Sequence, residues 1–274
     1  MNAVTIIKPR IATPLIYDSP HSGREYPDDW KTAAARDQLR LGEDAYVDEL
    51  IRSSVEIGAT VLSNNFPRSY IDVNREATDI DPDILSDEWA GELSPTEKSL
   101  RGLGLIRRYI VPGVQVLDDK ISSAEVSDRI DKVYRPYHAA LEGLIEETLV
   151  AFGKVWYIDW HSMKSRGNAM TPDGPGAVRA DFVVSDGQGA TSSPALVNTI
   201  VVTLESRGFS VSVNDPYKGG TLVRKFGKPE RGIHAVQIEI NRALYLDESR
   251  VERNSGFEKL VNDIEHLTSV LING

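Results

Sequence analysis

A short apolar run leads directly into polar residues at Val155-Trp156-Tyr157-Ile158-Asp159-Trp160-His161-Ser162. Its first half is rich in β-branched and aromatic types, the pattern of a strand buried on both faces. Its second half ends abruptly in an acid, an aromatic residue, a histidine and a serine. Because open α/β sheets place their chemistry beyond the carboxyl ends of such strands, the stretch predicts a central strand with His161 beside a functional site.

A second stretch has the same build. Residues 14–23 read PLIYDSPHSG, an apolar run that leads into Asp18 and then His21. Two of the five histidines therefore follow predicted strand ends. Either histidine alone could simply hydrogen-bond a neighbouring loop. The pair favours a metal site, since imidazole is the commonest metal ligand and such sites collect ligands from several strand ends.

The composition of the chain excludes several kinds of functional site and partner. The chain of 274 residues contains no cysteine, which excludes disulfides, thiolate nucleophiles and Cys-ligated metal sites. Its net charge of −10 argues against sequence-independent nucleic-acid binding, which needs a basic surface. No apolar run is long enough to span a bilayer, and the first residues lack the basic start and apolar core of a signal peptide. We therefore expect a cytoplasmic protein with no nucleic-acid or membrane partner.

Predicted strands and helices alternate along the chain. Strands are expected near residues 15–18, 59–63, 155–162, 181–185, 209–213 and 235–240, and helices near residues 28–39, 44–57, 123–152, 194–208 and 247–271. A further half-buried strand is expected between Arg68 and Arg75, where polar and apolar residues alternate. With no internal repeat and no clear linker, this pattern predicts a single α/β domain over residues 1–274 with a mixed, largely parallel sheet.

Asp44 and Glu239 are carboxylates at positions that are unusual for surface residues. Asp44 opens the predicted helix over residues 44–57, on the same stripe as apolar residues, so it is either an inward-facing ligand or an ordinary N-cap. Glu239 lies between two isoleucines of an apolar strand. A buried carboxylate must pair, bind a metal or have a raised pKa. Glu239 is thus a candidate general base, with an ion pair to Arg242 or Arg224 as the alternative.

Arginine and histidine complete the candidate site. Arg68 and Arg75 flank the predicted strand, and a guanidinium fork matches a carboxylate in a bidentate geometry; the alternative is a pair of solvated surface arginines. His21, His161 and one nearby carboxylate would make a two-histidine, one-acid zinc site with an open position. Zinc bound there would lower the pKa of a water to about 7 and polarise a carbonyl. With Glu239 moving the proton to the leaving nitrogen, the predicted reaction is hydrolysis of an amide.

Five segments in order resemble motifs of the N-formylglutamate amidohydrolase family. They are SPHSG at 19–23, PRSYIDVNR at 67–75, DWHS at 159–162, PYKGG at 216–220 and QIEIN at 237–241. The resemblance extends over most of the chain, from about residue 14 to residue 247. It implies a three-layer α/β/α fold of the zinc-carboxypeptidase/phosphorylase type. It also implies hydrolysis of N-formyl-L-glutamate to formate and L-glutamate, a step of bacterial histidine degradation.

The resemblance also implies roles for individual residues. His21 and His161 would hold one Zn²⁺ ion, Glu239 would be the catalytic glutamate, and Asn74 with Arg75 would hold a substrate carboxylate. Asp44 fits the family as the third metal ligand, with Glu25 as the alternative. Arg68 and Arg224 are candidates for the second carboxylate of the glutamyl group.

Several alternatives stay open at this point. The substrate could be another N-acyl amino acid or a small peptide, and the chain could instead be a non-catalytic protein that binds acidic ligands on the same fold. His138, inside the long predicted helix, is expected to have a core or surface role. The assembly, as a single chain or a homo-oligomer, is not indicated by the sequence.

Overall fold

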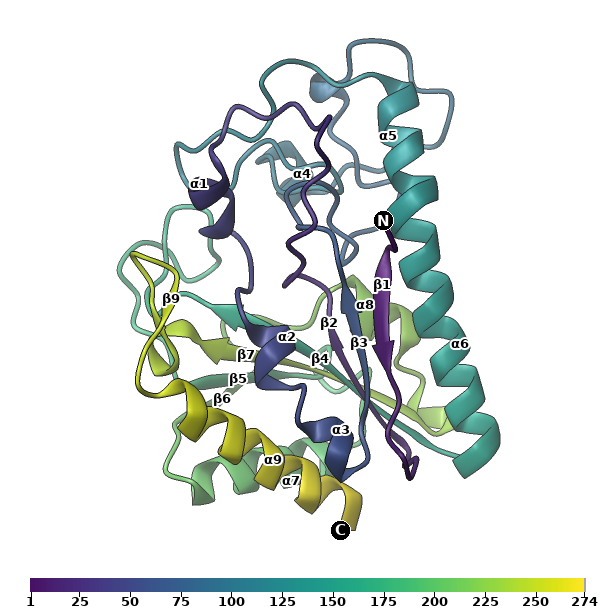
Figure 1. Cartoon of the computed structure of the whole chain (residues 1–274), viewed down its shortest axis with the longest axis vertical. Coiled ribbons are helices and arrows are strands. Elements are labelled where there is room, and N and C mark those ends of the chain that lie inside the picture. The colour runs from purple at the N-terminus through teal and green to yellow at the C-terminus, as the bar shows by residue number, and fades with distance from the viewer. Residues whose placement is uncertain (274) are drawn as a thin grey trace. The chain divides into compact units, whose positions relative to one another are not determined.

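A seven-stranded mixed sheet organises the computed structural model, which describes residues 1–273 (Figure 1). The strands are β1 Val4–Ile7, β2 Leu15–Ser19, β3 Thr60–Asn64, β4 Val155–Met163, β5 Phe182–Ser185, β6 Val211–Val213 and β7 Ile233–Asn241. Their order in the sheet is β1-β3-β2-β4-β7-β5-β6. β4 pairs in parallel with β2 on one side and with β7 on the other, whereas β5 runs antiparallel to β7. The predicted mixed, largely parallel sheet is confirmed.

The helices are mostly short in the first half of the chain and longer in the second. They are α1 Arg36–Arg40, α2 Val47–Leu50, α3 Ser54–Ile57, α4 Glu97–Leu100, α5 Ser123–Arg129, α6 Arg135–Phe152, α7 Pro194–Ser206, α8 Thr221–Phe226 and α9 Phe257–Asn273. A two-stranded hairpin of β8 Leu246–Asp247 and β9 Glu252–Arg253 precedes α9. Within residues 1–273, no helix combines the length and the apolar character that a bilayer crossing requires.

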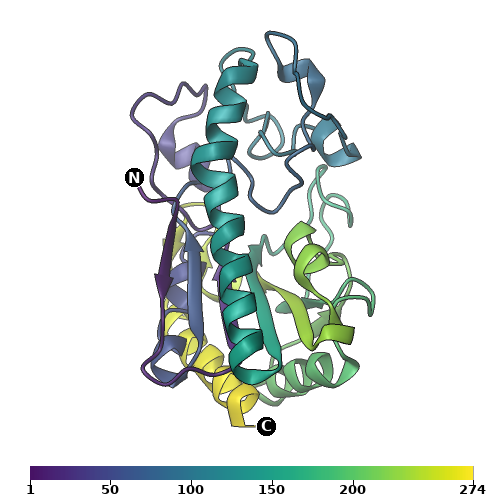
Figure 2. The same ribbon diagram turned by 90° about the vertical axis from the view of Figure 1, so that its right-hand side faces the viewer.

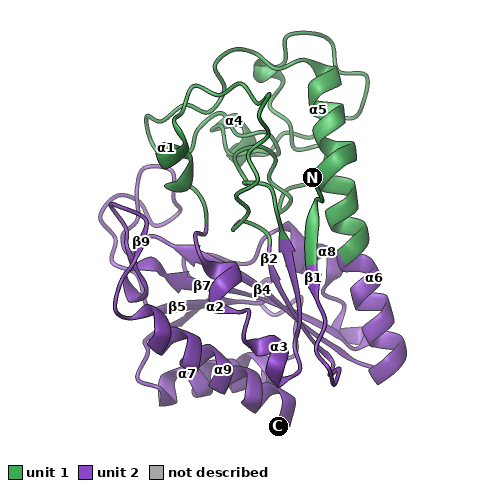
Figure 3. Ribbon diagram, in the orientation of Figure 1, with its two compact units in different colours: residues 1–5, 20–43, 64–140 green, residues 6–19, 44–63, 141–274 purple. Residues whose placement is uncertain are grey.

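The chain divides into two compact units (Figure 3). Unit 1 comprises residues 1–5, 20–43 and 64–140, and its long irregular segments surround a small apolar core that includes Leu39, Ile110 and Val116. Unit 2 comprises residues 6–19, 44–63 and 141–274. The expectation of a single domain over residues 1–274 stays a prediction.

Helices cover both faces of the sheet in unit 2. The Tyr17 hydroxyl lies 2.9 Å from the Thr268 hydroxyl of α9, whereas the Tyr157 ring contacts Phe226 of α8. In register, Tyr17 pairs with Ile158 and Ile16 pairs with Tyr157, so the two tyrosines point to opposite faces. α9 and α8 therefore lie on opposite faces, and α2, α3 and α7 contact α9 (Figures 1 and 2). This is the predicted three-layer α/β/α arrangement.

The predicted strand between Arg68 and Arg75 does not form. Residues 67–75 form turns, in which Tyr70 N donates to Pro67 O and Asp72 N donates to Leu105 O. Ile71, Asp72 and their two successors are all buried, so the alternation of polar and apolar types does not mark two faces of a strand. A polar residue that is buried with its partners produces the same sequence pattern as one that faces solvent.

Three helix predictions need correction. Residues 28–39 give only α1, and residues 44–57 give two short helices separated by a turn. α9 begins at Phe257 and not at residue 247, because the hairpin occupies the preceding residues. The long helix over residues 123–152 is confirmed, with a π-helical segment, Ile130–Tyr134, directly before α6. Pro136 has no N–H for the carbonyl one turn earlier, and a local change of helix type accommodates that loss.

Candidate metal centre and carboxylate-binding cluster

Four polar residues of neighbouring strands share one face of the sheet in unit 2. In the parallel pairing of β4 with β7, His161 lies opposite Glu239 and Asp159 lies opposite Gln237. Since side chains two residues apart on a strand point the same way, the four side chains form one polar row. All four residues are buried. The sequence placed His161 and Glu239 on strands, and the register brings them side by side.

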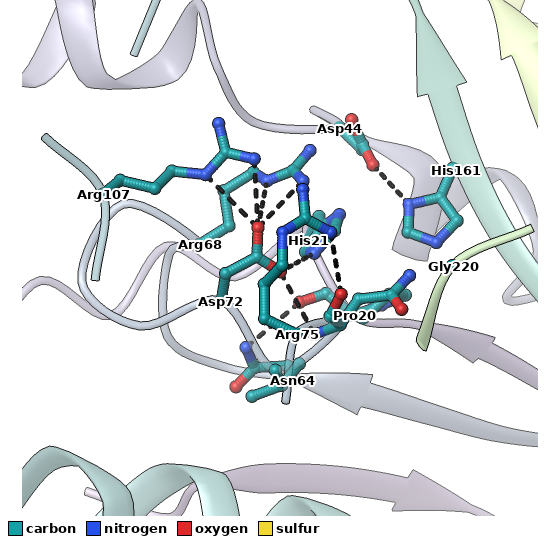
Figure 4. A network of polar contacts seen from close by, with 12 residues as sticks. Pro20, His21, Asp44, Asn64, Arg68, Asp72, Arg75, Arg107, His161 and Gly220 are labelled. Atoms are coloured by element: carbon teal, nitrogen blue, oxygen red, sulfur yellow. Dashed lines mark hydrogen bonds and ion pairs between the residues drawn. The ribbon is translucent and has the colours of Figure 1, made fainter. Parts of the chain in front are cut away.

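His161 has a carboxylate at each ring nitrogen. Its Nδ1 lies 2.9 Å from Oδ2 of Asp44 (Figure 4), and its Nε2 lies 2.8 Å from Oδ1 of Asp159. Burial lowers the pKa of His161, but the charge and hydrogen bond of Asp159, the hydrogen bond of Asp44 and the charge of Glu239 together raise it well above the ordinary value. The ring therefore lies in a pocket of negative charge, which is a suitable environment for a cation.

Asp44 is not a helix cap. The N-cap of α2 is Tyr46, and Oδ1 of Asp44 accepts a 3.0 Å hydrogen bond from Nη2 of Arg242. Nε of Arg242 also donates to the Ser162 hydroxyl at 3.0 Å. The buried guanidinium thus fixes one oxygen of Asp44, while the other oxygen faces His161. Asp44 is therefore buried and faces His161, so the capping interpretation is wrong, and its role as a metal ligand stays a prediction.

Glu239 is held by its neighbour on the same strand face. Nε2 of Gln237 donates to Oε1 of Glu239 at 2.8 Å, and Oε1 of Gln237 accepts from the backbone N of Gly220 at 2.6 Å. The amide of Gln237 therefore connects the 216–220 loop to the carboxylate. A carboxylate that is fixed in this way is suited to proton transfer in one geometry.

In unit 1, His21 contacts a second buried carboxylate. Its Nε2 lies 2.7 Å from Oδ1 of Asp72, which is fully buried (Figure 4). Burial raises the pKa of Asp72, but the charges of His21, Arg68 and Arg75 and the hydrogen bond with His21 hold it well below the ordinary value. Asp72 is thus a permanent anion at neutral pH. Each of the two histidines therefore has a carboxylate beside its Nε2, Asp72 for His21 and Asp159 for His161.

His21, Asp44 and His161 form a group that could hold a metal ion. Their ligand atoms, one from each residue, all lie within 4.8 Å of one another, and all three residues are buried. Two imidazoles and one carboxylate are the ligand types of catalytic zinc sites. Histidine ligands usually give their second nitrogen to a carboxylate, as both histidines do here. Glu25, the alternative third ligand, is exposed and lies outside this group.

The predicted substrate-binding residues have different environments. Arg68 donates to Oδ2 of Asp72 through Nε and Nη2, at 3.3 and 3.0 Å. Asn74 is buried, and its backbone N donates to Oδ1 of Asp72 at 3.1 Å. Arg75 donates to the Leu103 and Asn74 carbonyls at 2.9 and 2.8 Å.

Arg224 and His138, two other residues considered in the sequence, lie outside the candidate metal group. Arg224 is exposed on α8, and its side chain makes no polar contact with any residue that the structure describes. His138 is buried and bonds the Val73 carbonyl at 2.9 Å through Nε2, so of the two expected roles, core or surface, it has the core one.

The sequence analysis missed four contributors: Asp72, Arg107, Asp159 and Gln237. Asp159 and Gln237 each lie two residues before a candidate on the same strand, so strand periodicity could have identified both. Asp72 and Arg107, whose Nε and Nη2 donate to Oδ2 of Asp72 at 3.2 and 3.0 Å, carried no such signal. They meet only because residues 67–75 form turns against the segment that contains Leu105.

The sequence profile and the relatives that match this chain belong to the same family. A sequence profile described as N-formylglutamate amidohydrolase matches residues 13–246. Proteins named N-formylglutamate deformylase are 26% identical in Pseudomonas putida and 27% identical in Pseudomonas aeruginosa, each covering 86% of this chain and 83% of the relative.

Solved structures agree with the sequence comparison. The crystal structure of N-formylglutamate amidohydrolase from Ralstonia eutropha JMP134 is 40% identical, covers 99% of this chain and 98% of its own, and superposes with a TM-score of 0.93. The product of gene Atu2144 from Agrobacterium tumefaciens is 18% identical over 99% of this chain and 95% of its own, with a TM-score of 0.73, which shows a shared fold. The chain belongs to the N-formylglutamate amidohydrolase family.

Proposed function

We propose that this chain hydrolyses N-formyl-L-glutamate to formate and L-glutamate with the help of one zinc ion. The observation that carries the proposal is the group of His21, Asp44 and His161, with Glu239 paired in register beside His161. Family membership supports the substrate, because the matched profile and the relatives carry that activity in their names.

The residues fit zinc. His21 and His161 would give Nδ1, since Nε2 of each ring faces a carboxylate, and Asp44 would give Oδ2, since its Oδ1 is bonded to Arg242. Zinc held by such a set lowers the pKa of a water to about 7 and polarises a carbonyl. Asp72 and Asp159 fix the ring orientations and tautomers of the two histidines.

Glu239 is the proton carrier in this proposal. Its carboxylate accepts a proton from the water that attacks the formyl carbon, and it then gives that proton to the amide nitrogen as the C–N bond breaks. This gives formic acid and the free amine, and the acid proton then passes to the amine, so the products are formate and the ammonium form of L-glutamate and atoms and charge balance. Gln237 holds the carboxylate in place through the 2.8 Å hydrogen bond to Oε1.

Substrate carboxylates require cations or hydrogen-bond donors. Asn74 and Arg75 would hold the α-carboxylate, and Arg68 is a candidate for the carboxylate of the glutamyl side chain. Nε and Nη1 of Arg75 are fixed by two backbone carbonyls, so its guanidinium plane is set before substrate arrives. Preset donors lose less conformational entropy on binding.

The test is release of formate from N-formyl-L-glutamate by purified protein, measured before chelation, after chelation and after zinc is restored. Release that follows zinc occupancy is the expected result. A folded, zinc-loaded protein that releases no formate from this substrate but deacylates another N-acyl amino acid would overturn the substrate. A protein that binds acidic ligands without any turnover would overturn the reaction.

A further inference from the structure

Three arginines of unit 1 gather around one carboxylate. Arg68 and Arg107 both donate to Oδ2 of Asp72, each through Nε and Nη2, at 3.0 to 3.3 Å (Figure 4). The charge of Arg75 also acts on Asp72. Oδ1 of the same carboxylate is taken by His21 and by the backbone N of Asn74. Asp72 is thus shared among more cations than it can neutralise.

The excess positive charge is most marked at Arg107. Its side chain is 7% exposed, so water offers it little stabilisation. Burial and the charges of Arg68 and Arg75 lower the pKa of Arg107 to about 9, although the charge and hydrogen bond of Asp72 raise it. A buried cation without enough negative charge is costly. An anionic ligand at this cluster would relieve that cost.

Arg107 still has donors to offer. A guanidinium has five N–H groups in a planar fork and can bind two carboxylates along different edges. Arg107 uses only Nε and Nη2, and no residue that the structure describes accepts a hydrogen bond from its Nη1.

A purely structural role explains Arg107 poorly. The segment that carries it is already fixed by backbone bonds from Asp72 N to Leu105 O and from Leu105 N to Asp79 O, both 2.8 Å. Asp72 already has Arg68 and His21 as partners. A second guanidinium on the same oxygen adds charge that the fold does not need.

We propose that Arg107, together with Arg68, binds the side-chain carboxylate of the substrate and makes the site selective for N-acyl dicarboxylic amino acids. This inference rests on the proposed function and adds the residue that sets its substrate class. Arg107 replaces Arg224 as the partner of Arg68, because Arg224 is exposed on α8 and Arg107 is part of the cluster. Asp72 holds both guanidinium groups in place.

The experiment compares Arg107→Gln with wild type on two substrates of equal shape, N-formyl-L-glutamate and N-formyl-L-glutamine. Loss of one charge-assisted contact raises KM for the dicarboxylate by roughly 10- to 100-fold. The kcat for that substrate changes little, and the KM for the uncharged amide is unchanged. Arg107→Lys, which keeps the charge and loses the fork, has an intermediate KM and provides a second test if Arg107→Gln does not fold.

Arg108→Gln is the matched control. Arg108 is the next residue, pairs with Asp81 and belongs to no part of the proposed site, so its variant keeps the kinetics of wild type on both substrates. Equal losses on both substrates for Arg107→Gln would assign Arg107 a structural role, and unchanged kinetics would remove it from the site. Either result overturns the inference.

Calorimetric titration with L-glutamate and L-glutamine separates this inference from the proposed function. If wild type releases no formate from N-formyl-L-glutamate, the reaction is wrong but the cluster can still be tested. Tighter binding of L-glutamate that weakens at least tenfold in Arg107→Gln, with L-glutamine unaffected, supports the dicarboxylate site. Equal binding by both proteins, or no binding by wild type, overturns it.

Discussion

Nε2 of His161 lies 2.8 Å from Oδ1 of Asp159, the residue two positions earlier on the same face of β4. A strand thereby supplies both the candidate metal ligand and the carboxylate that orients it. The β-sheet hydrogen bonds hold the backbone of both residues, so the contact does not depend on a mobile loop.

Asp159→Asn should weaken zinc binding by about 10- to 100-fold, the usual cost of losing the carboxylate behind a histidine ligand. Asparagine keeps the shape of the side chain but loses its charge. Competition with a chromogenic chelator measures the affinity. Asp181→Asn, which changes a half-buried aspartate that accepts from the Ser210 hydroxyl, should leave zinc affinity unchanged. Equal zinc affinity in wild type and Asp159→Asn would contradict the orienting role.

Glu239→Gln should lower kcat by about a hundred- to ten-thousandfold, the range for loss of a general acid–base group. Zinc content and the midpoint of thermal unfolding should stay near those of wild type, since the amide retains size and polarity. Steady-state kinetics on N-formyl-L-glutamate measures the effect. Glu230→Gln, at an exposed position, is the matched control and should retain full turnover. Retained turnover in Glu239→Gln would exclude Glu239 as the proton carrier.

Chelation should destabilise wild type but not His161→Ala. A ligand that binds only the folded state adds about 2.7 kcal/mol at a free concentration 100-fold above its Kd. Unfolding in urea, with and without a slight excess of zinc, measures the difference. His138→Ala is a useful comparison, because this variant removes a buried histidine outside the metal group and should keep the zinc response. A zinc response in His161→Ala equal to that of wild type would contradict the ligand assignment.

Arg75→Lys should raise KM for N-formyl-L-glutamate by about 10-fold with a smaller change in kcat. Lysine cannot offer the planar fork, and it cannot reproduce the two backbone contacts that set the guanidinium plane. Arg101→Lys, on an exposed side chain, should have the KM of wild type. An unchanged KM in Arg75→Lys would show that Arg75 does not contact the substrate.

Asp72→Asn should lower the free energy of unfolding of the metal-free protein by about 3–5 kcal/mol at pH 7, because it removes one partner of a buried charge cluster. The folded pKa of Asp72 lies well below its unfolded value near 3.9. The stabilisation is therefore complete above the unfolded pKa and decreases as pH falls toward the folded pKa. Urea unfolding at pH 7 and at pH 3 should give a smaller difference between variant and wild type at the lower pH.

Asp119→Asn provides the control for this pH comparison, since Asp119 is exposed and its carboxylate accepts from the neighbouring backbone N of Lys120. Its unfolding free energy should follow that of wild type at both pH values. A difference between Asp72→Asn and wild type that does not depend on pH would contradict a buried Asp72 anion as the source of the stabilisation.

The sequence predicted His161 and Glu239, which lie on strands, and missed Asp72 and Arg107, which meet through tertiary contacts. His161 and Glu239 stood out because each interrupts or ends an apolar run. Their pairing could not be predicted, because residues 78 apart become neighbours only when β7 is placed beside β4. The strand order is set by packing over the whole sheet, and no local pattern encodes it.

Arg107 was harder to predict from the sequence than His161 or Glu239. The segment around it is irregular, and residues 67–75 are turns whose conformation depends on contacts such as Asp72 N with Leu105 O. Local propensity therefore could not assign either segment, and a half-buried strand was the wrong interpretation of the alternation. A buried polar cluster has no sequence period, because its members come from different loops.

The amide of Gln237 has a consequence for protein engineering. Its oxygen accepts from the backbone of Gly220 and its nitrogen donates to Glu239, so both ends of one planar group are used. Glutamate at this position would lose the donor, and leucine would lose both bonds. A loop transplanted from a distant relative in place of residues 216–220 would therefore keep Glu239 oriented only if it presents a backbone N–H where Gly220 does. Chimeras at this loop should be designed with residue 237 and the loop exchanged as one cassette.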